Sequence, residues 1–133
     1  MNAVTGVKVQ RIVCAQDRGI VVNPEGAKMQ MEGCITIGLG YALTEELRFY
    51  GGEILDLNFD TYAIPRFSWA PPIKTVLVKN DTLAQQSGGE PAITTTGAVI
   101  ANAVFDATGI RMTQLPMTSE RILQAIAAKN AKV

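Results

Sequence analysis

Apolar and polar positions follow two different periods along this chain, and each change of period marks a new element. Residues 7–14 open with Val7 and Val9 alternating with polar neighbours and are rich in β-branched residues, which predicts a strand. Asp17, Arg18 and Gly19 are then expected to break it. A second β-branched run at residues 73–78 predicts another strand.

The strongest periodic pattern in the sequence begins at Asn23-Pro24-Glu25. Asn can cap a helix, Pro suits the first helical position, and an acid in the first turn complements the helix dipole. From there residues of the apolar stripe recur at helical spacing, at Ala27, Met31, Cys34, Ile35, Gly38, Leu39, Ala42 and Leu43. This spacing predicts a long helix.

Three glycines, Gly33, Gly38 and Gly40, lie within the predicted helix. Each is about 1 kcal/mol less favourable than Ala in a helix interior. One explanation is close approach by another backbone or a large ligand. The other is a helix that ends or bends near the last two glycines, and the sequence leaves both explanations open.

The middle of the chain predicts a β-hairpin over residues 46–56, because Gly51-Gly52 can supply the positive φ angles of a tight turn. Residues 57–72 are expected to be irregular. Residues 80–91 form a polar, glycine-containing loop. A second helical stripe follows and ends at Thr108-Gly109, where Gly suits a C-cap, with its members at Ile93, Gly97, Ile100, Ala101, Val104 and Phe105.

A linker at Leu115-Pro116 precedes the last helix, which Thr118 or Ser119 caps and which frays from Lys129 onward. The element order is therefore strand, helix, hairpin, strand, helix, helix, which predicts a mixed α/β, or α+β, unit. The chain has 133 residues and no repeat or internal boundary. We expect a single domain over residues 1–133.

Composition narrows the classes of function. Apolar residues make up 47% and charged residues 18%, which is typical of a globular chain rather than a disordered one. The net charge is zero and no basic stripe is present, so a nucleic-acid partner has no electrostatic support. Residues 1–6 lack the pattern of a signal peptide, and the apolar-rich stretch 29–43 is too short and too polar to span a bilayer. We expect a soluble cytoplasmic protein.

The two cysteines, Cys14 and Cys34, form no CxxC motif, and the chain has no histidine. These facts exclude a self-contained zinc site of the Cys/His type and an iron–sulfur site with four thiolates, so we predict no metal ligands. Buried, reduced thiols in apolar surroundings are expected instead. Without histidine, Ser-His and Cys-His catalysis within the chain are also excluded.

One loop combines residues that could carry chemistry. Gly88 and Gly89 allow unusual backbone angles and close approach by a ligand, and Glu90 follows immediately before a predicted helix. A carboxylate held rigidly in a pocket can serve as a general base. A Gly-Gly turn with a Glu that favours the helix dipole explains the same residues, and composition alone favours this structural explanation.

Taken together, these segments resemble the molybdenum-cofactor subunit of the xanthine dehydrogenase and aldehyde oxidase family, and most resemble its isoquinoline and aldehyde oxidoreductase branch. The matching stretches run in family order from about Val9 to Ile122: VQRIVCAQDRGIVVNPEGAKMQMEGCITIGLGYALTEEL, NFDTYAIPR, GGEPAITTTGAVIANAVFDATG and RMTQLPMTSERI. The GGEP segment alone is a weak motif. In register with the Asn-Pro helix and its QMEG it becomes specific.

The resemblance implies an oxidoreductase that hydroxylates an aldehyde or an N-heterocycle with oxygen from water. It implies that Glu90 is the catalytic base, that Gln30 of QMEG lies close to the pterin, and that Gly88 and Gly89 let Glu90 approach the metal. A molybdenum–molybdopterin cofactor would carry the redox step.

The family's subunit is several times longer, so the resemblance implies that this chain is a C-terminal segment of it. Its partners would be the rest of the molybdenum subunit and the iron–sulfur and flavin subunits, with the periplasm remaining open as the compartment of the complete enzyme. We expect the isolated chain to bind no cofactor and to be inactive. The alternative is a non-catalytic structural module that closes its exposed cofactor face by forming a homo-oligomer.

Overall fold

The computed structural model of the chain describes residues 7–131. The expectation about residues 1–6, and the end of the predicted fraying at 132–133, lie outside the described residues. The elements occur in the predicted order, which confirms the mixed α/β class. They are β1 (Ile12–Asp17), α1 (Pro24–Leu43), β2 (Phe49–Tyr50), β3 (Glu53–Ile54), the 3-10 helix η1 (Phe67–Trp69), β4 (Ile73–Val78), α2 (Pro91–Thr108) and α3 (Ser119–Asn130).

Strands β1 and β4 pair in parallel, with Ile12 opposite Ile73 and Asp17 opposite Val78. Parallel strands need a long crossover, which α1 and the segment after it provide. The first strand was predicted to start at residue 7, and this start is wrong; the break predicted at Asp17-Arg18-Gly19 is confirmed at Arg18 and Gly19, while Asp17 is the last residue of the strand. The partner strand decides the extent of β1, because residues 7–11 lie beyond the start of β4 and Asp17 still has a partner in it.

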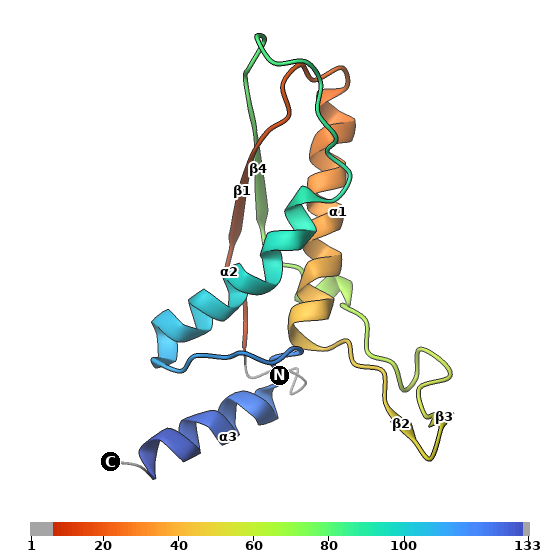
Figure 1. Cartoon of the computed structure of the whole chain (residues 1–133), viewed down its shortest axis with the longest axis vertical. Coiled ribbons are helices and arrows are strands. Elements are labelled where there is room, and N and C mark those ends of the chain that lie inside the picture. The colour runs from red at the N-terminus through yellow and green to blue at the C-terminus, as the bar shows by residue number, and fades with distance from the viewer. Residues whose placement is uncertain (1–6, 132–133) are drawn as a thin grey trace.

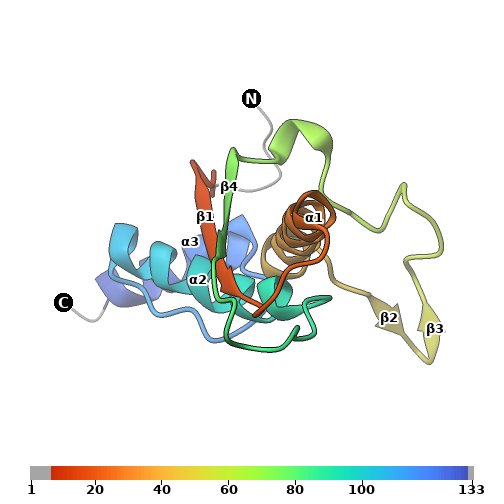
Figure 2. The ribbon, with the colours of Figure 1, turned by 90° about the horizontal axis from the view of Figure 1, so that it is seen from above.

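Helix α1 runs alongside the two-stranded ribbon and packs against both β4 and α2 (Figures 1 and 2). Its start is as predicted, since the Asn23 side chain accepts a hydrogen bond of 3.0 Å from the backbone N–H of Gly26. None of the helices within residues 7–131 combines the length and the apolar character that crossing a membrane requires.

The glycines of α1 do not end the helix, which continues to Leu43. A Cβ at Gly38 would lie 2.7 Å from the Thr96 Cβ, and a Cβ at Gly40 would meet the side chains of Glu45 and Pro65. Close approach therefore explains two of the glycines, although the neighbours are side chains rather than another backbone. Nothing lies within 4 Å of a Cβ at Gly33.

The core has two parts, and the second underlies the candidate site. The first joins α1, α2 and α3 through Leu39, Ala42, Leu43, Ile100, Val104, Met117 and Ile122. The second packs the start of α2 and the middle of α1 on the strands through Met31, Cys34, Ile35 and Ala92. Both cysteines are free thiols, and burial and the neighbouring Cys34 raise the pKa of Cys14.

The segment 46–70, which we call the arm, leaves the body of the molecule and carries the β2–β3 hairpin at its tip (Figure 1). Gly51 and Gly52 have φ angles of 59° and 87°, which confirms the predicted turn. At the hairpin base Arg48 forms an ion pair of 2.5 Å with Asp56. The helix ends also agree with prediction, since Gly109 caps α2 with φ 67° and the Thr118 side chain caps α3.

Candidate functional site

The loop that carries Glu90 is held along its length by the turn that follows β1. The Ile20 N–H donates to the Leu83 carbonyl at 3.0 Å, and the Gln86 N–H donates to the Arg18 carbonyl at 2.8 Å. Gly19, at the centre of this turn, has φ 65°, and a Cβ there would lie 2.5 Å from the Leu83 oxygen. Only glycine suits both the angle and the space.

The side chain of Asp17 adds a polar anchor at the other end of the same loop. Its carboxylate accepts hydrogen bonds from the Asn80 side-chain amide at 2.8 Å and from the Gly19 N–H at 2.9 Å. The bond from Asn80, followed by the bond from Gly19, holds the pKa of Asp17 below its ordinary value. The ionised carboxylate therefore joins the end of β1 to the start of the loop.

The guanidinium of Arg18 lies directly against Gly88, where any Cβ would overlap it. Gly88 is buried. Because it has no side chain, the guanidinium of Arg18 can approach its backbone closely. From the sequence, Arg18 was predicted only as part of a strand break. The sequence near Arg18 indicated only that it follows a strand. Its contact with Gly88 could not be predicted from neighbouring residues, because Gly88 lies 70 positions further along the chain.

The carbonyl of Gly89 accepts two hydrogen bonds from side chains of α1. The Gln30 Nε2 donates at 2.7 Å and the Cys34 Sγ donates at 2.9 Å. The QMEG and GGEP motifs, far apart in the sequence, therefore meet at one oxygen atom. The structure brings together Gln30, Gly89 and, as the next residue, Glu90.

Glu90 occupies the N-cap position of α2, but its side chain forms no capping hydrogen bond. A carboxylate at the start of a helix still complements the helix dipole without such a bond, so the structural explanation stays open beside the catalytic one. The backbone carbonyl of Glu90 accepts a hydrogen bond of 3.0 Å from the Ile93 N–H, so the main chain of Glu90 is fixed at the start of α2. The side chain is exposed, and the enclosure that a buried base requires is not supplied by residues 7–131.

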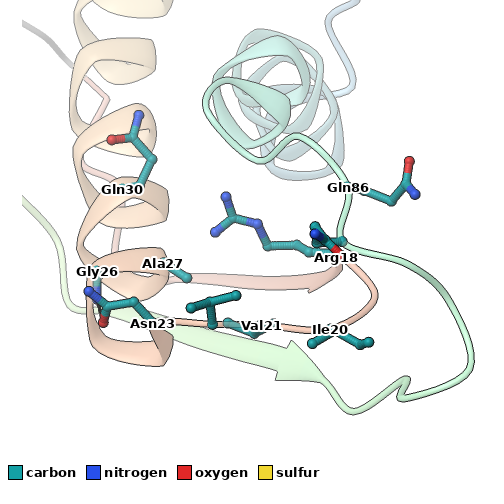
Figure 3. A pocket seen from close by; sticks show the side chains of 10 residues that line it. Arg18, Ile20, Val21, Asn23, Gly26, Ala27, Gln30 and Gln86 are labelled. Carbon is teal, nitrogen blue, oxygen red and sulfur yellow. Dashed lines mark hydrogen bonds between the residues drawn. The ribbon is translucent and has the colours of Figure 1, made fainter.

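A cleft of about 300 Å³ lies between the turn after β1, the first turns of α1 and the loop (Figure 3). Figure 3 shows the Arg18 side chain extending between α1 and the loop segment that carries Gln86. Gln30 lines this cleft and also binds Gly89, so it connects the cleft to the residue before Glu90. The wall of the cleft also contains apolar and small residues, namely Ile20, Val21, Val22, Gly26 and Ala27.

The donors at this cleft suit an organic cofactor rather than a bare metal ion. Guanidinium and amide N–H groups donate to phosphate oxygens and to ring acceptors, and Arg18 and Gln86 carry such groups at the cleft, whereas the amide nitrogen of Gln30 already donates to Gly89 and Cys34. Across residues 7–131 no three or more acidic, cysteine or histidine side chains gather closely enough to hold a metal ion.

Comparison with known proteins finds relatives that match most of the chain. A family model for the molybdopterin cofactor-binding domain matches residues 2–71. A nicotinate dehydrogenase polypeptide of Pseudomonas putida is 35% identical over 120 residues, which is 90% of this chain and 10% of that protein. The beta chain of isoquinoline 1-oxidoreductase from Brevundimonas diminuta is 37% identical over 111 residues, 84% of this chain and 14% of that protein.

The fold is also found in a solved structure. The crystal structure of quinoline 2-oxidoreductase from Pseudomonas putida matches with a TM-score of 0.80 at 24% identity, over 90% of this chain and 16% of that chain. At this identity the likeness shows the fold alone.

The chain belongs to the family of molybdopterin cofactor-binding domains. The resemblance to molybdenum-cofactor subunits of the xanthine dehydrogenase and aldehyde oxidase family is thereby confirmed. The chain spans 10% and 14% of the two relatives described above. The family match includes Gln30 and ends before Glu90, so the role of Glu90 depends on the GGEP motif and its geometry.

Proposed function

We propose that this chain forms part of a molybdenum hydroxylase and contributes its glutamate base, Glu90. The reaction class is hydroxylation of an aldehyde or an N-heterocycle with water as the oxygen source. The observation that carries the proposal is the 2.7 Å hydrogen bond between Gln30 and Gly89, because it unites the two family motifs at one place. Each motif alone can be explained by helix or turn structure. Such structure does not explain why the two motifs meet beside a cleft that is lined by hydrogen-bond donors.

The residues of the cleft would hold part of the cofactor. Arg18 and Gln86 offer donors of the type that bind phosphate and pterin acceptor atoms, and Gln30, which the family resemblance places near the pterin, lines the same cleft. When bound, molybdenum–molybdopterin supplies the redox chemistry and the activation of the oxygen that reacts. The described residues supply no ligand set for the metal itself, so the chain's part is to bind the organic portion and to present Glu90.

Glu90 would act as the acceptor of a proton. Its main chain is fixed at the start of α2, and its carboxylate is exposed and uncommitted to a cap. Such a group can take a proton from a hydroxyl that is brought within hydrogen-bond reach. The exclusion of water that strengthens this step would come from chain segments that pack over the site.

We further propose that the remainder of a molybdenum subunit covers the arm, with iron–sulfur and flavin subunits as further partners. Phe49, Tyr50, Phe59 and Phe67 of the arm are between 75% and 99% exposed. Exposed aromatic side chains concentrated in one segment are typical of an interaction surface. The long relatives, of which this chain spans a small part, are consistent with such a partner.

The test is Glu90→Gln in a complete enzyme that contains this chain. We expect turnover to fall on the order of 10²- to 10⁴-fold, the contribution typical of a general base, while molybdenum and cofactor content stay unchanged. The matched control is Glu120→Gln on α3, which should retain full turnover. Near-normal turnover in Glu90→Gln would remove this residue from the proposed role.

The second candidate function is a non-catalytic module that assembles with copies of itself. The exposed aromatic side chains of the arm favour it, because association between copies would cover them. The two functions differ in what the purified complete protein contains, since only the enzyme part requires molybdenum and its organic cofactor.

A further inference from the structure

We propose that Gln30 and Cys34 are positioning residues for Glu90. Together they hold the carbonyl of Gly89 and so set the direction in which the Glu90 side chain leaves the backbone. We call this arrangement the Gly89 clamp. Its importance for catalysis rests on the proposed role of Glu90, but the clamp itself can be tested without any catalysis.

The geometry of the clamp follows from one face of α1. Gln30 and Cys34 are four residues apart, so their side chains lie on the same side of the helix. Both point at one oxygen, with Nε2 at 2.7 Å and Sγ at 2.9 Å from the Gly89 carbonyl, and they lie 3.6 Å from one another. A peptide unit is planar, so holding this oxygen also fixes the Glu90 N–H and the bond to its Cα.

The contacts of Arg18 and of the turn after β1 end at Gly88, and the clamp acts on the peptide that follows, between Gly89 and Glu90. Gly88 and Gly89 are adjacent, and glycine has the widest choice of backbone angles. A Cβ at Gly89 would meet nothing within 4 Å, so packing does not restrict the residue. On the other side, Pro91 and the bond from Ile93 already fix Glu90 in α2. The clamp therefore restrains the side of Glu90 that precedes α2.

The two donors of the clamp differ in their surroundings, because Cys34 lies in the core and Gln30 lies at the surface. Cys34 is 5% exposed and packs in the core with Met31, Ile35 and Ala92, so core packing determines where its thiol lies. Gln30 is exposed and lines the cleft. The amide nitrogen of Gln30 thus has a task within the protein, in addition to the pterin contact that the family resemblance implies.

The clamp can be tested by nuclear magnetic resonance on the 133-residue chain. The reporters are the carbonyl ¹³C shift of Gly89, which responds to hydrogen bonds at its oxygen, and the order parameter of the Glu90 amide. We expect Gln30→Leu with Cys34→Ala to move the Gly89 shift and to lower the Glu90 order parameter from about 0.85 to below about 0.6. Cys34→Ser in place of Cys34→Ala should restore part of both, because the hydroxyl can donate.

Gln124→Leu on α3 is the matched control, since it makes the same chemical change far from the loop and should leave both reporters unchanged. Cys34 is buried, so Cys34→Ala can lower the stability of the chain. In that case Gln30→Leu alone is measured, because residue 30 is exposed and its substitution leaves the core unchanged. An unchanged Gly89 shift in Gln30→Leu, with the chain folded, would overturn the clamp.

A second measurement links the clamp to turnover in the complete enzyme. Cys34 does not line the cleft, so Cys34→Ala should lower kcat on the order of ten- to a hundredfold without loss of cofactor, and Cys34→Ser should recover much of it. If Glu90→Gln stays active while the Gly89 shift responds to Gln30→Leu, the proposed function fails and the clamp stands. If Glu90→Gln is inactive and the shift does not respond, the clamp alone fails.

Discussion

Gly88 and Gly89 are neighbours in the chain, yet they serve two different contacts. Gly88 leaves room for the guanidinium of Arg18, while Gly89 is open on its Cα side and offers its carbonyl to α1. The sequence predicted both as glycines that admit a ligand or let Glu90 approach the metal, and that expectation stays a prediction. The contacts that the structure shows are made by the chain's own residues.

At the scale of residues, we expect Gly88→Ala to act through Arg18. The added methyl would overlap the guanidinium, which must move. In a double-mutant cycle for the free energy of unfolding, Gly88→Ala and Arg18→Ala should therefore be coupled by about 1 kcal/mol. Gly89→Ala is the matched control, because open space surrounds it, and it should show no coupling with Arg18→Ala. Equal coupling of both glycines would contradict this assignment of contacts.

At the scale of elements, α1 is the helix that brings the site together. Its N-cap and apolar stripe were predictable because both depend on neighbouring residues. Its length was less certain, because glycines near its end are compatible with a bend. Thr96 of α2 resolves the uncertainty for Gly38, since the close approach of the two helices leaves no space there for a Cβ.

The glycines of α1 give a matched pair for measurement by urea unfolding. Gly33→Ala adds a methyl in open space, so it should stabilise the chain by about 1 kcal/mol through helix propensity. Gly38→Ala gains the same propensity but places its Cβ 2.7 Å from the Cβ of Thr96, which cannot move without its backbone. Overpacking costs about 1–3 kcal/mol, so a net loss is expected. Stabilisation by both substitutions would show that the two helices are not in close contact.

The hairpin of the arm is joined at its base by the carboxylate of Asp56. Hydrogen bonds from Arg48, side chain first and then backbone, hold the pKa of Asp56 below its ordinary value. The group is stabilising while it is ionised, so its contribution is complete above the unfolded pKa of about 3.9 and is lost as the pH falls through the lower folded value.

We therefore expect Asp56→Asn to loosen the hairpin at neutral pH. The reporter is hydrogen exchange of the Leu55 amide, which donates to the Arg48 carbonyl at 2.9 Å. Its exchange should become faster in Asp56→Asn, and in the unsubstituted chain its protection should fall only below about pH 3.9. Asp81→Asn, at an exposed ion pair, is the control and should leave Leu55 unchanged. Protection that is the same in both variants would show that Asp56 does not hold the arm.

At the scale of the whole molecule, the chain exposes surfaces that a single domain ordinarily covers. Four aromatic side chains of the arm, Phe49, Tyr50, Phe59 and Phe67, lie open to solvent. The chain spans a small part of its relatives, so we propose that segments of a longer subunit provide the cover. The same exposure would drive association between copies of the isolated chain.

The isolated chain should accordingly contain no molybdenum, hydroxylate no aldehyde or N-heterocycle, and self-associate with rising concentration. Elemental analysis, an activity assay and light scattering test the three statements on one preparation. Phe49→Ser with Tyr50→Ser should shift the association to higher concentration, because both side chains are exposed on the hairpin. Stoichiometric molybdenum would contradict the proposal that other segments complete the cofactor site.

Much of this protein could be predicted from its sequence because the relevant forces act between near neighbours. Caps, turn glycines and helical spacing located α1, the hairpin, α2 and α3, and the motifs around Gln30 and Glu90 indicated the family that comparison confirmed. The start of β1 could not be predicted in this way. A strand is limited by its partner, and the alternation of residues 7–11 continues past the point where β4 begins.

Only the tertiary structure decided what the candidate base is attached to. Sequence placed Glu90 after two glycines and before a helix, but the donors that hold its peptide lie 55 and 59 residues away from Gly89, on α1. Arg18, which contacts Gly88, also lies far from it in the sequence, 70 positions earlier. Contacts of this range depend on how α1 packs on β1 and β4, and no local pattern records that packing. The identity of the base was thus a matter of sequence, whereas its position is a property of the folded chain.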